Sequence, residues 1–353
     1  SAELSRVFPS TQLLWVPLSN IYQLENGVKA QGEGVTKFSG LQNQVSCGSL
    51  HNMLDVTPLG HFESDKVPLW TKNGKKMISA DRYMDLMEVF KPDMILAISD
   101  GRTNLNDGYK RICKSVERTC NMLDRLKIYP TFLKTIISGV IVGTANKAKC
   151  EECIKHVLKY KDDLLGIALG GITDGNDESW NVPAPDLEEI LKRVGETLPK
   201  DLLKVLDGCW NPAVILAAVE HGWDLFDGTY PVKLTNAGFA LNLNLDVESQ
   251  SDELCILDLK EFKPILEGCE CLACRKHTRA YIRHLLNTRE MLAIFLLVNT
   301  SSSLIVLSNY RVFPIQGVPK GYVAGKGVVG VVTRVTRKII KKSTLDISIK
   351  KCI

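Results

Sequence analysis

Five successive repeats of an apolar run, a short loop and a helical pattern dominate the middle of the sequence. Each stretch after a run places apolar side chains three and four residues apart, which is typical of helices. The runs cover residues 94–98, 136–142, 164–169, 202–206 and 223–226. Because parallel strands need long crossover connections, this alternation predicts an α/β fold with helices covering a parallel sheet.

The alternation alone leaves two architectures open, a doubly wound open sheet and a closed (β/α)8 barrel. No G-x-G-x-x-G follows any of the runs, which argues against a dinucleotide-binding fold. Asp and Gly residues stand at the run ends, and in a barrel those ends form the active-site face. For any one position, a simple turn is the more ordinary explanation of Asp or Gly.

Outside the repeats the pattern is less regular. Short strands are expected at 13–16 and 45–47, a helix at 80–90, a hairpin within 235–260 and a helix at 278–292. Lys75–Met77 leads into the helix at 80–90.

Charge is spread unevenly over the 353 residues, whose formal net charge is +4. Residues 331–353 carry seven basic side chains and one acidic one, so the rest of the chain is slightly negative. The net charge of the chain outside this basic tail therefore does not favour binding to nucleic acid. Any contact with RNA must come from a local basic patch or from a partner protein. The basic tail could bind RNA or an acidic membrane, but a solvated end is the favoured interpretation.

Eleven cysteines suit a reducing compartment. The longest apolar run, Met291–Val298, is far shorter than the roughly 20 residues of a membrane span.

Cys269, Cys271 and Cys274 form the sharpest local motif, C-x-C-x-x-C. Three thiolates this close can converge on one tetrahedral ion, and zinc (Zn²⁺) is the usual occupant. The alternative is three unrelated reduced thiols. His277 and His284 are near enough in the sequence to be considered as a fourth ligand.

The cysteine motif and the segment after it, His277–Leu286, resemble the zinc loop and helix of the tRNA-guanine transglycosylase family. Four strand ends agree with that family in the same order. Asp100 stands where the family has a base-recognising aspartate, and Asp227 stands where it has its nucleophile. The other two agreements are Gly170–Ile172, which resembles a Gly-Gly-Leu strand end, and Asp207–Pro212, which resembles a Met-Gly-x-x-x-Pro turn.

The resemblance implies a (β/α)8 TIM-type barrel with an appended zinc-binding subdomain. It divides the chain into a barrel body over 1–260 with a shortened N-terminus, a zinc-binding loop and helix over 261–292, and a divergent basic tail over 293–353. The three motif cysteines would hold one structural zinc per subunit. The family's histidine ligand position is Thr300 here.

In active members of the family, an aspartate attacks C1′ of the wobble guanosine, and another base then replaces guanine through a covalent ribosyl-enzyme. Several groups that this chemistry needs are replaced in the present sequence. The stretch 45–51 stands in place of an Asp-Ser-Gly-Gly motif that supplies an acid/base aspartate. Gly139–Gly143 has aliphatic residues in place of a base-binding glutamine, and these cannot hydrogen-bond. Lys233 stands in place of an arginine and loses its bidentate geometry.

Asp100 and Asp227 are therefore expected to be vestigial, substrate-facing carboxylates, with no catalytic residue in the chain. This combination resembles the accessory, non-catalytic subunits of eukaryotic queuine tRNA-ribosyltransferases, which act on guanine at wobble position 34 of tRNAs with GUN anticodons. The resemblance implies a heterodimer with a catalytic queuine tRNA-ribosyltransferase subunit and contact with tRNA. It also implies a cytoplasmic location with peripheral attachment to the mitochondrial outer membrane.

A homodimer is the other assembly considered. Two other functions stay open: a catalytically active transglycosylase with Asp227 as nucleophile, and an unrelated zinc-binding barrel hydrolase.

Overall fold

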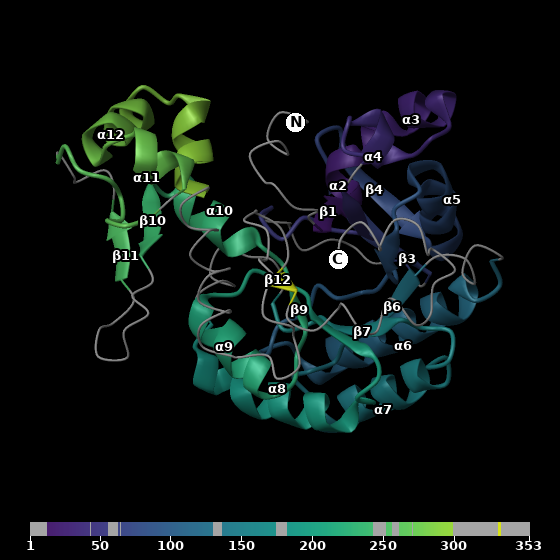
Figure 1. Ribbon diagram of the computed structural model, residues 1–353. Coiled ribbons are helices and arrows are strands. Elements are labelled where there is room, and N and C mark those ends of the chain that lie inside the picture. Colours follow the sequence, from purple (N-terminus) through teal and green to yellow (C-terminus); the bar gives the residue numbers. More distant parts are fainter. Residues whose placement is uncertain are drawn as a thin grey trace. The chain divides into compact units, whose positions relative to one another are not determined.

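The computed structural model describes residues 13–42, 44–55, 63, 65–129, 136–173, 182–242, 252–255, 261–269, 271–298 and 331–332. Two compact units divide the chain, one over Leu13–Asp227 and one that begins at Gly228. Figure 1 shows the elements of both units. Among the described helices, none combines the length and the apolar character needed to cross a membrane.

A parallel sheet forms the centre of the first unit. Its strands follow one another in the order β1-β2-β5-β6-β7-β8-β9, and every neighbouring pair is parallel. The strands are Leu13–Pro17 (β1), Val45–Ser49 (β2), Met94–Leu96 (β5), Ile136–Ile141 (β6), Gly166–Leu169 (β7), Leu203–Leu206 (β8) and Leu225–Phe226 (β9). The predicted α/β fold with a parallel sheet is therefore confirmed.

The sheet of the described chain is open. A short strand, β12 (Val331–Val332), lies next to β9 at one end of the strand order, and β1 lies at the other end. Within the described ranges no ladder joins these two edges. The parallel α/β arrangement is thus established, whereas closure into a (β/α)8 barrel is not seen.

Helices connect the strands and follow one another around the outside of the sheet (Figure 1). They are Ala80–Phe90 (α5), Tyr109–Leu126 (α6), Lys147–Leu158 (α7), Ala184–Thr197 (α8) and Pro212–Glu220 (α9). Asn211 caps the start of α9, because its Oδ1 accepts a hydrogen bond from the Val214 N–H at 3.0 Å. The predicted helices in the repeats are confirmed, with ends that differ by a few residues.

Strands β7 and β8 are buried along their whole length, as expected for the middle of a covered parallel sheet. They also approach each other unusually closely. A Cβ added to Gly166 would lie 2.5 Å from the Leu203 carbonyl oxygen, so only glycine fits there.

The N-terminal part of the first unit contains short helices and a hairpin. The helical segments are Leu18–Ile21 (α2), Tyr22–Leu24 (η1), Glu25–Gln31 (α3) and Val35–Phe38 (α4). Strands Lys66–Thr71 (β3) and Gly74–Ser79 (β4) pair antiparallel. Lys75–Met77, which the sequence places just before the helix at 80–90, forms part of β4; Lys76 is exposed there and Lys75 is half-buried.

The second unit contains a helix, a hairpin and a cluster of short helices. Its elements are Thr229–Asn236 (α10), Phe239–Asn242 (β10), Asp252–Cys255 (β11), Leu272–Lys276 (α11) and Arg279–Asn287 (α12). The predicted hairpin is confirmed by the antiparallel β10–β11 pair, although the first residues of 235–260 belong to α10.

The folded part of the second unit extends into the predicted C-terminal tail. Residues 291–298 are helical. Ala293, Leu296 and Leu297 are buried in one cluster with Ile265 and Ile282. The tail beyond residue 298 lies outside the described residues, apart from β12.

Candidate functional site

A pocket lies at the carboxyl ends of the strands in the first unit. The ends of four strands and the loops after them line it: Ser49, Leu50, His51 and Met53 at β2, Ser99, Gly101 and Arg102 after β5, Gly170–Thr173 after β7 and Asp207 after β8, and Val140 of β6 also contributes. Its empty volume is about 560 Å³, with the solvent at its mouth included. Because parallel α/β folds bind ligands at this edge, the pocket is the candidate site of the unit.

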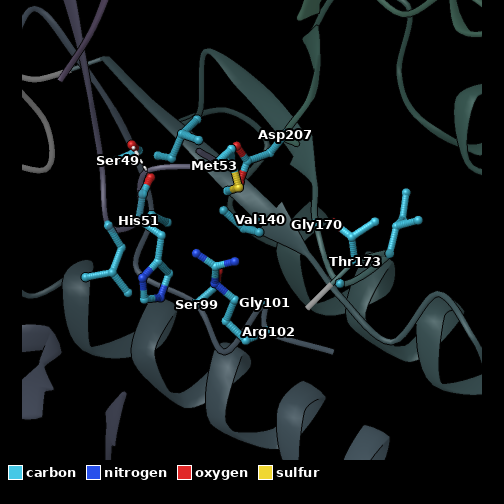
Figure 2. A pocket seen from close by; sticks show the side chains of 15 residues that line it. Ser49, His51, Met53, Ser99, Gly101, Arg102, Val140, Gly170, Thr173 and Asp207 are labelled. Atoms are coloured by element: carbon cyan, nitrogen blue, oxygen red, sulfur yellow. Dashed lines mark hydrogen bonds between the residues drawn. The ribbon is translucent and has the colours of Figure 1, made fainter. Parts of the chain in front are cut away.

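Three polar side chains enter the pocket from different loops. Figure 2 shows Arg102 extending between the His51 ring and Val140, with Asp207 on a separate wall. Arg102 is buried, and so is His51. The His51 Nδ1 atom is shielded from solvent and has no hydrogen-bond partner among the described residues.

His51 is a neutral imidazole at pH 7. Burial penalises its charged form, and the Arg102 guanidinium repels it, so the pKa of His51 is held well below its usual value.

Asp207 is the carboxyl group that faces the pocket. Burial raises the pKa of Asp207 to about 7, the nearby Asp227 carboxylate adds to the rise, and Arg102 opposes it. Its Oδ1 is shielded from solvent and accepts no hydrogen bond from the described residues. The pocket therefore contains a group that changes its charge near neutral pH.

Asp100, one of the two carboxylates predicted to face substrate, is bound by the protein itself. The residue is 1% exposed and does not line the pocket. Arg111 donates from Nη1 to Oδ2 at 2.7 Å and from Nη2 to Oδ1 at 2.6 Å, and Arg118 pairs with Oδ2 as well. The backbone is also held, because Ser115 donates its hydroxyl to the Asp100 carbonyl and the Asp100 N–H donates to Thr119. Helix α6 thus occupies both carboxylate oxygens.

Asp227, the other predicted carboxylate, is buried at the end of β9 and is not among the residues that line the pocket. It lies near Asp207 and Cys47, since its charge raises the pKa of both. Burial is the larger cause for Cys47, whose pKa is raised so far that the thiol stays protonated. Cys47 lies on β2, and its thiol is therefore uncharged at neutral pH.

Other parts of the pocket lining are apolar or already hydrogen-bonded. Val140 lies on β6 in the strand end that resembles the family's glutamine-bearing one. The Gly171 carbonyl accepts hydrogen bonds from the hydroxyls of Thr144 at 2.6 Å and Thr103 at 3.3 Å. Gly171 has a φ of 69°, and a Cβ there would lie 2.8 Å from the Thr103 hydroxyl, so this turn requires glycine.

The three motif cysteines converge in the second unit. The sulfur atoms of Cys269, Cys271 and Cys274 all lie within 4.8 Å of one another. Cys271 also caps α11, since its sulfur accepts a hydrogen bond from the Cys274 N–H at 3.4 Å. The cluster packs against the buried apolar residues of the unit. Three thiols that converge on one point fit a tetrahedral thiophilic ion, so the motif can hold a metal.

Neither histidine considered as a fourth ligand belongs to this group within the described chain. His277 instead stacks on Tyr281 with ring centroids 5.3 Å apart. Thr300 lies outside the described residues.

Sequence reasoning did not identify His51 or Arg102 as pocket residues. The available signal was their position, because each follows the carboxyl end of a predicted strand within a few residues. Asp207 is one of the strand-end residues that the sequence places on the active-site face of a barrel, with a simple turn as the more ordinary explanation.

Comparison with known proteins gives one family and a consistent set of relatives. The queuine tRNA-ribosyltransferase family matches residues 11–300. A protein of Culex quinquefasciatus named queuine tRNA-ribosyltransferase accessory subunit 2 is 33% identical over 299 residues, covering 81% of this chain and 70% of the relative. Proteins of the same name from Aedes aegypti and Drosophila melanogaster are 31% and 29% identical, covering 82% and 81% of this chain and 71% of each relative.

Proposed function

The chain belongs to the queuine tRNA-ribosyltransferase family, and from that membership we propose that it is the non-catalytic accessory subunit of a heterodimeric queuine tRNA-ribosyltransferase. Its catalytic partner would exchange guanine for queuine at position 34 of tRNAs with GUN anticodons. This chain would bind the partner and part of the tRNA. Membership in this family excludes the alternative that the chain is an unrelated barrel hydrolase.

The engagement of Asp100 is the observation that carries the proposal. A carboxylate that recognises a base must offer its oxygen atoms to that base. Both Asp100 oxygens already accept from arginines of α6. Separating a buried ion pair costs about 3–5 kcal/mol, and base binding would have to supply this free energy. Asp100 therefore serves the fold and not the substrate.

The surroundings of Asp227 support the same role. A nucleophilic carboxylate must be ionised, must reach C1′ of the ribose and needs an acid/base partner. Asp227 is buried beside another acid, Asp207, whose pKa is raised in part by the Asp227 charge. In active members of the family, an aspartate and a glutamine would assist the nucleophile. The resemblance puts Cys47 and Val140 near the corresponding positions of this chain.

One observation favours the alternative of an active transglycosylase. Asp207, with a pKa raised to about 7, lies close to Asp227 and has the properties of an acid/base group. In that alternative Asp227 would be the nucleophile and Asp207 would replace the missing aspartate of the family.

The proposal also includes the bound metal, the closure of the sheet and the location of the chain in the cell. Cys269, Cys271 and Cys274 would hold a structural zinc ion. The sheet would close into a (β/α)8 barrel through segments beyond those described. The cytoplasmic location with peripheral attachment to the mitochondrial outer membrane rests on resemblance alone, and fractionation of cells that express the tagged chain tests it.

A base-exchange assay separates the accessory role from the active alternative. The purified chain is incubated with guanine-34 tRNA and labelled queuine, alone and with the catalytic homologue. We expect incorporation only in the mixture, unchanged when Asp227→Ala or Asp207→Asn replaces the wild-type chain. Incorporation by the chain alone that disappears in Asp227→Ala would establish the active enzyme instead.

A further inference from the structure

The β3–β4 hairpin carries a cluster of lysines at its tip. Lys72 stands in the turn between the two strands, and Lys75 and Lys76 follow at the start of β4. Lys72 and Lys76 are exposed, whereas Lys75 is half-buried. The segment 66–79 contains four lysines and no acidic residue. The tip is therefore a local basic patch on a chain whose charge outside the C-terminal tail is slightly negative.

The acidic side chains that flank the hairpin lie away from its tip or pair with other groups. Glu63 pairs with the lysine at the base of β3 at 2.7 Å. Asp65 directly precedes β3, at the same base. Asp81, in the first turn of α5, pairs with Arg125. Within the described chain, neither exposed lysine of the tip forms an ion pair with an acid.

Hydrogen bonds and a cation–π contact fix the shape of the tip. The Thr71 hydroxyl donates to the Gly74 carbonyl at 2.9 Å and accepts from the Asn73 N–H at 3.2 Å. Lys75 lies opposite Trp70 in the ladder, and its ammonium group is 6.0 Å from the centroid of the Trp70 ring. The backbone that carries the lysines is therefore ordered before a partner binds, which lowers the entropic cost of binding.

The hairpin is anchored at the same edge of the sheet as the pocket. It is inserted between β2 and α5, in the connection that leaves the carboxyl end of β2, and Figure 1 shows it beside α5. Ser49, the last residue of β2, lines the pocket. Just before the hairpin, the Glu63 carbonyl accepts a hydrogen bond at 2.8 Å from Nε of Arg118, the same side chain that pairs with Asp100.

A phosphate backbone is the partner that fits this basic tip. Lysine ammonium groups bind phosphate oxygens as point charges, and such contacts position a nucleic acid without reading its bases. An acidic membrane is the other anionic surface to consider. No large apolar side chain is exposed on the described hairpin to enter a bilayer, and lipid-binding segments usually gather about four to eight basic residues. RNA is therefore favoured over lipid.

We propose that Lys72, Lys75 and Lys76 form a contact site for the phosphate backbone of tRNA. The site rests on the proposed accessory function, which supplies the tRNA, and it assigns the part of this chain that touches it. Each lysine that neutralises a phosphate releases bound cations, so the contact weakens as the salt concentration rises.

The test measures binding of guanine-34 tRNA to the full chain, alone and mixed with the catalytic homologue, over a series of salt concentrations. We expect the triple variant Lys72→Gln/Lys75→Gln/Lys76→Gln to raise the Kd about tenfold or more at physiological salt. The slope of log K against log salt should fall by about 2 to 3. The kcat for queuine exchange by the mixture at saturating tRNA should stay unchanged, because the site touches phosphates and not the reacting base.

The matched control removes three exposed lysines near the amino edge of the sheet, Lys155, Lys161 and Lys200. Their replacement by Gln should leave the Kd and the salt slope unchanged. Equal weakening by the two triple variants, or wild-type binding by the hairpin variant, overturns the proposal. It is also overturned if the hairpin variant keeps tRNA binding but loses binding to phosphatidylserine vesicles. Should the triple variant fail to fold, Lys72→Gln/Lys76→Gln is used, with a fall in slope of about 2 expected.

Failure of the hairpin site and failure of the accessory role give different results. If the mixture exchanges queuine and the hairpin variant binds tRNA as the wild type does, only the hairpin site is excluded. If the chain adds nothing to exchange but its own tRNA binding depends on the hairpin lysines, the site stands and the accessory role falls. A wild-type chain that contributes no tRNA binding, alone or in the mixture, excludes the site.

Discussion

Asp100 has both carboxylate oxygens engaged by arginines of its own chain, so we expect it to contribute to stability. Replacing Asp100 by Asn removes the charge that Arg111 and Arg118 face, with almost no change in volume. Breaking a buried pair by removing one partner costs about 3–5 kcal/mol, and Arg111 is partly exposed. We therefore expect the free energy of unfolding in urea to fall by about 3 kcal/mol.

The control for this measurement uses another aspartate that pairs with an arginine of α6. Asp81 and Arg125 form an ion pair in which both side chains are exposed. Asp81→Asn should lower the free energy of unfolding by less than about 1 kcal/mol, because solvent screens surface pairs. Equal effects of the two substitutions would contradict the structural role of Asp100.

Asp207 should make stability depend on pH. Its pKa is raised to about 7 in the folded chain, mainly by burial, while an unfolded aspartate titrates near 4. Between these values the folded state binds more protons than the unfolded state, so this group lowers stability as the pH rises from about 4 to 7. Asp207→Asn should therefore stabilise the chain relative to wild type more at pH 8 than at pH 5.

Urea unfolding of both proteins at the two pH values measures this difference, which we expect to reach about 2 kcal/mol or more. A pH-independent difference would show that Asp207 is ionised normally in the folded chain.

The residue-level features of the pocket were only partly predictable. Asp100 and Asp227 could be placed at strand ends from the sequence, because apolar runs mark where strands stop. Arg111 and Arg118 bind Asp100 because of the way α6 packs against the loop after β5. The pattern of the amino-acid sequence does not reveal this packing. His51 and Arg102 were missed for the same reason, since each becomes notable only when strands far apart in sequence lie side by side.

At the level of elements, the cysteine loop and helix α11 depend on each other. Cys271 belongs to the metal motif and also caps α11. We expect Cys271→Ser to lose most of its bound zinc, measured by plasma mass spectrometry, because two thiolates hold zinc poorly. Amide hydrogen exchange should then increase over 271–298 and stay unchanged in β5 to β8.

Cys113→Ser is the matched control, since Cys113 is a half-buried thiol on α6, outside the metal motif. It should keep full zinc content. Loss of zinc in both variants would mean that the metal is not held by the motif.

Helices and strands were easier to predict than the contacts of single side chains. The spacing of apolar residues and the residues that cap helices are local properties of the sequence. The strands and helices of the repeats were found this way, including the start of α9 at Asn211. The β3–β4 hairpin and α10 were missed, because the lysines of β4 and the proline of α10 obscure the usual patterns. The helix over residues 291–298 was missed because its buried face packs against the apolar residues around the metal motif.

At the scale of the whole molecule, the second unit exposes apolar side chains that a partner would cover. Met291 is 86% exposed, and Tyr281, Leu292 and Ile294 are also exposed. If this surface binds the catalytic homologue, Met291→Asp should weaken the heterodimer at least tenfold, because it places a charge in a desolvated interface. Sedimentation velocity of the mixed proteins measures the affinity.

Ile128, which is 66% exposed at the end of α6, is the matched control. Ile128→Asp should leave the affinity unchanged. Equal weakening by both substitutions would show a general loss of folding, and no effect of Met291→Asp would place the interface elsewhere.

The two arginines of α6 have a consequence for attempts to give the pocket a base-exchange activity. Grafting an acid/base aspartate and a glutamine into the pocket would still leave Asp100 bound to Arg111 and Arg118. Freeing that carboxylate means redesigning a helix whose buried face also supports the sheet. On the proposed accessory role, side-chain replacements in the pocket alone should therefore not produce an enzyme.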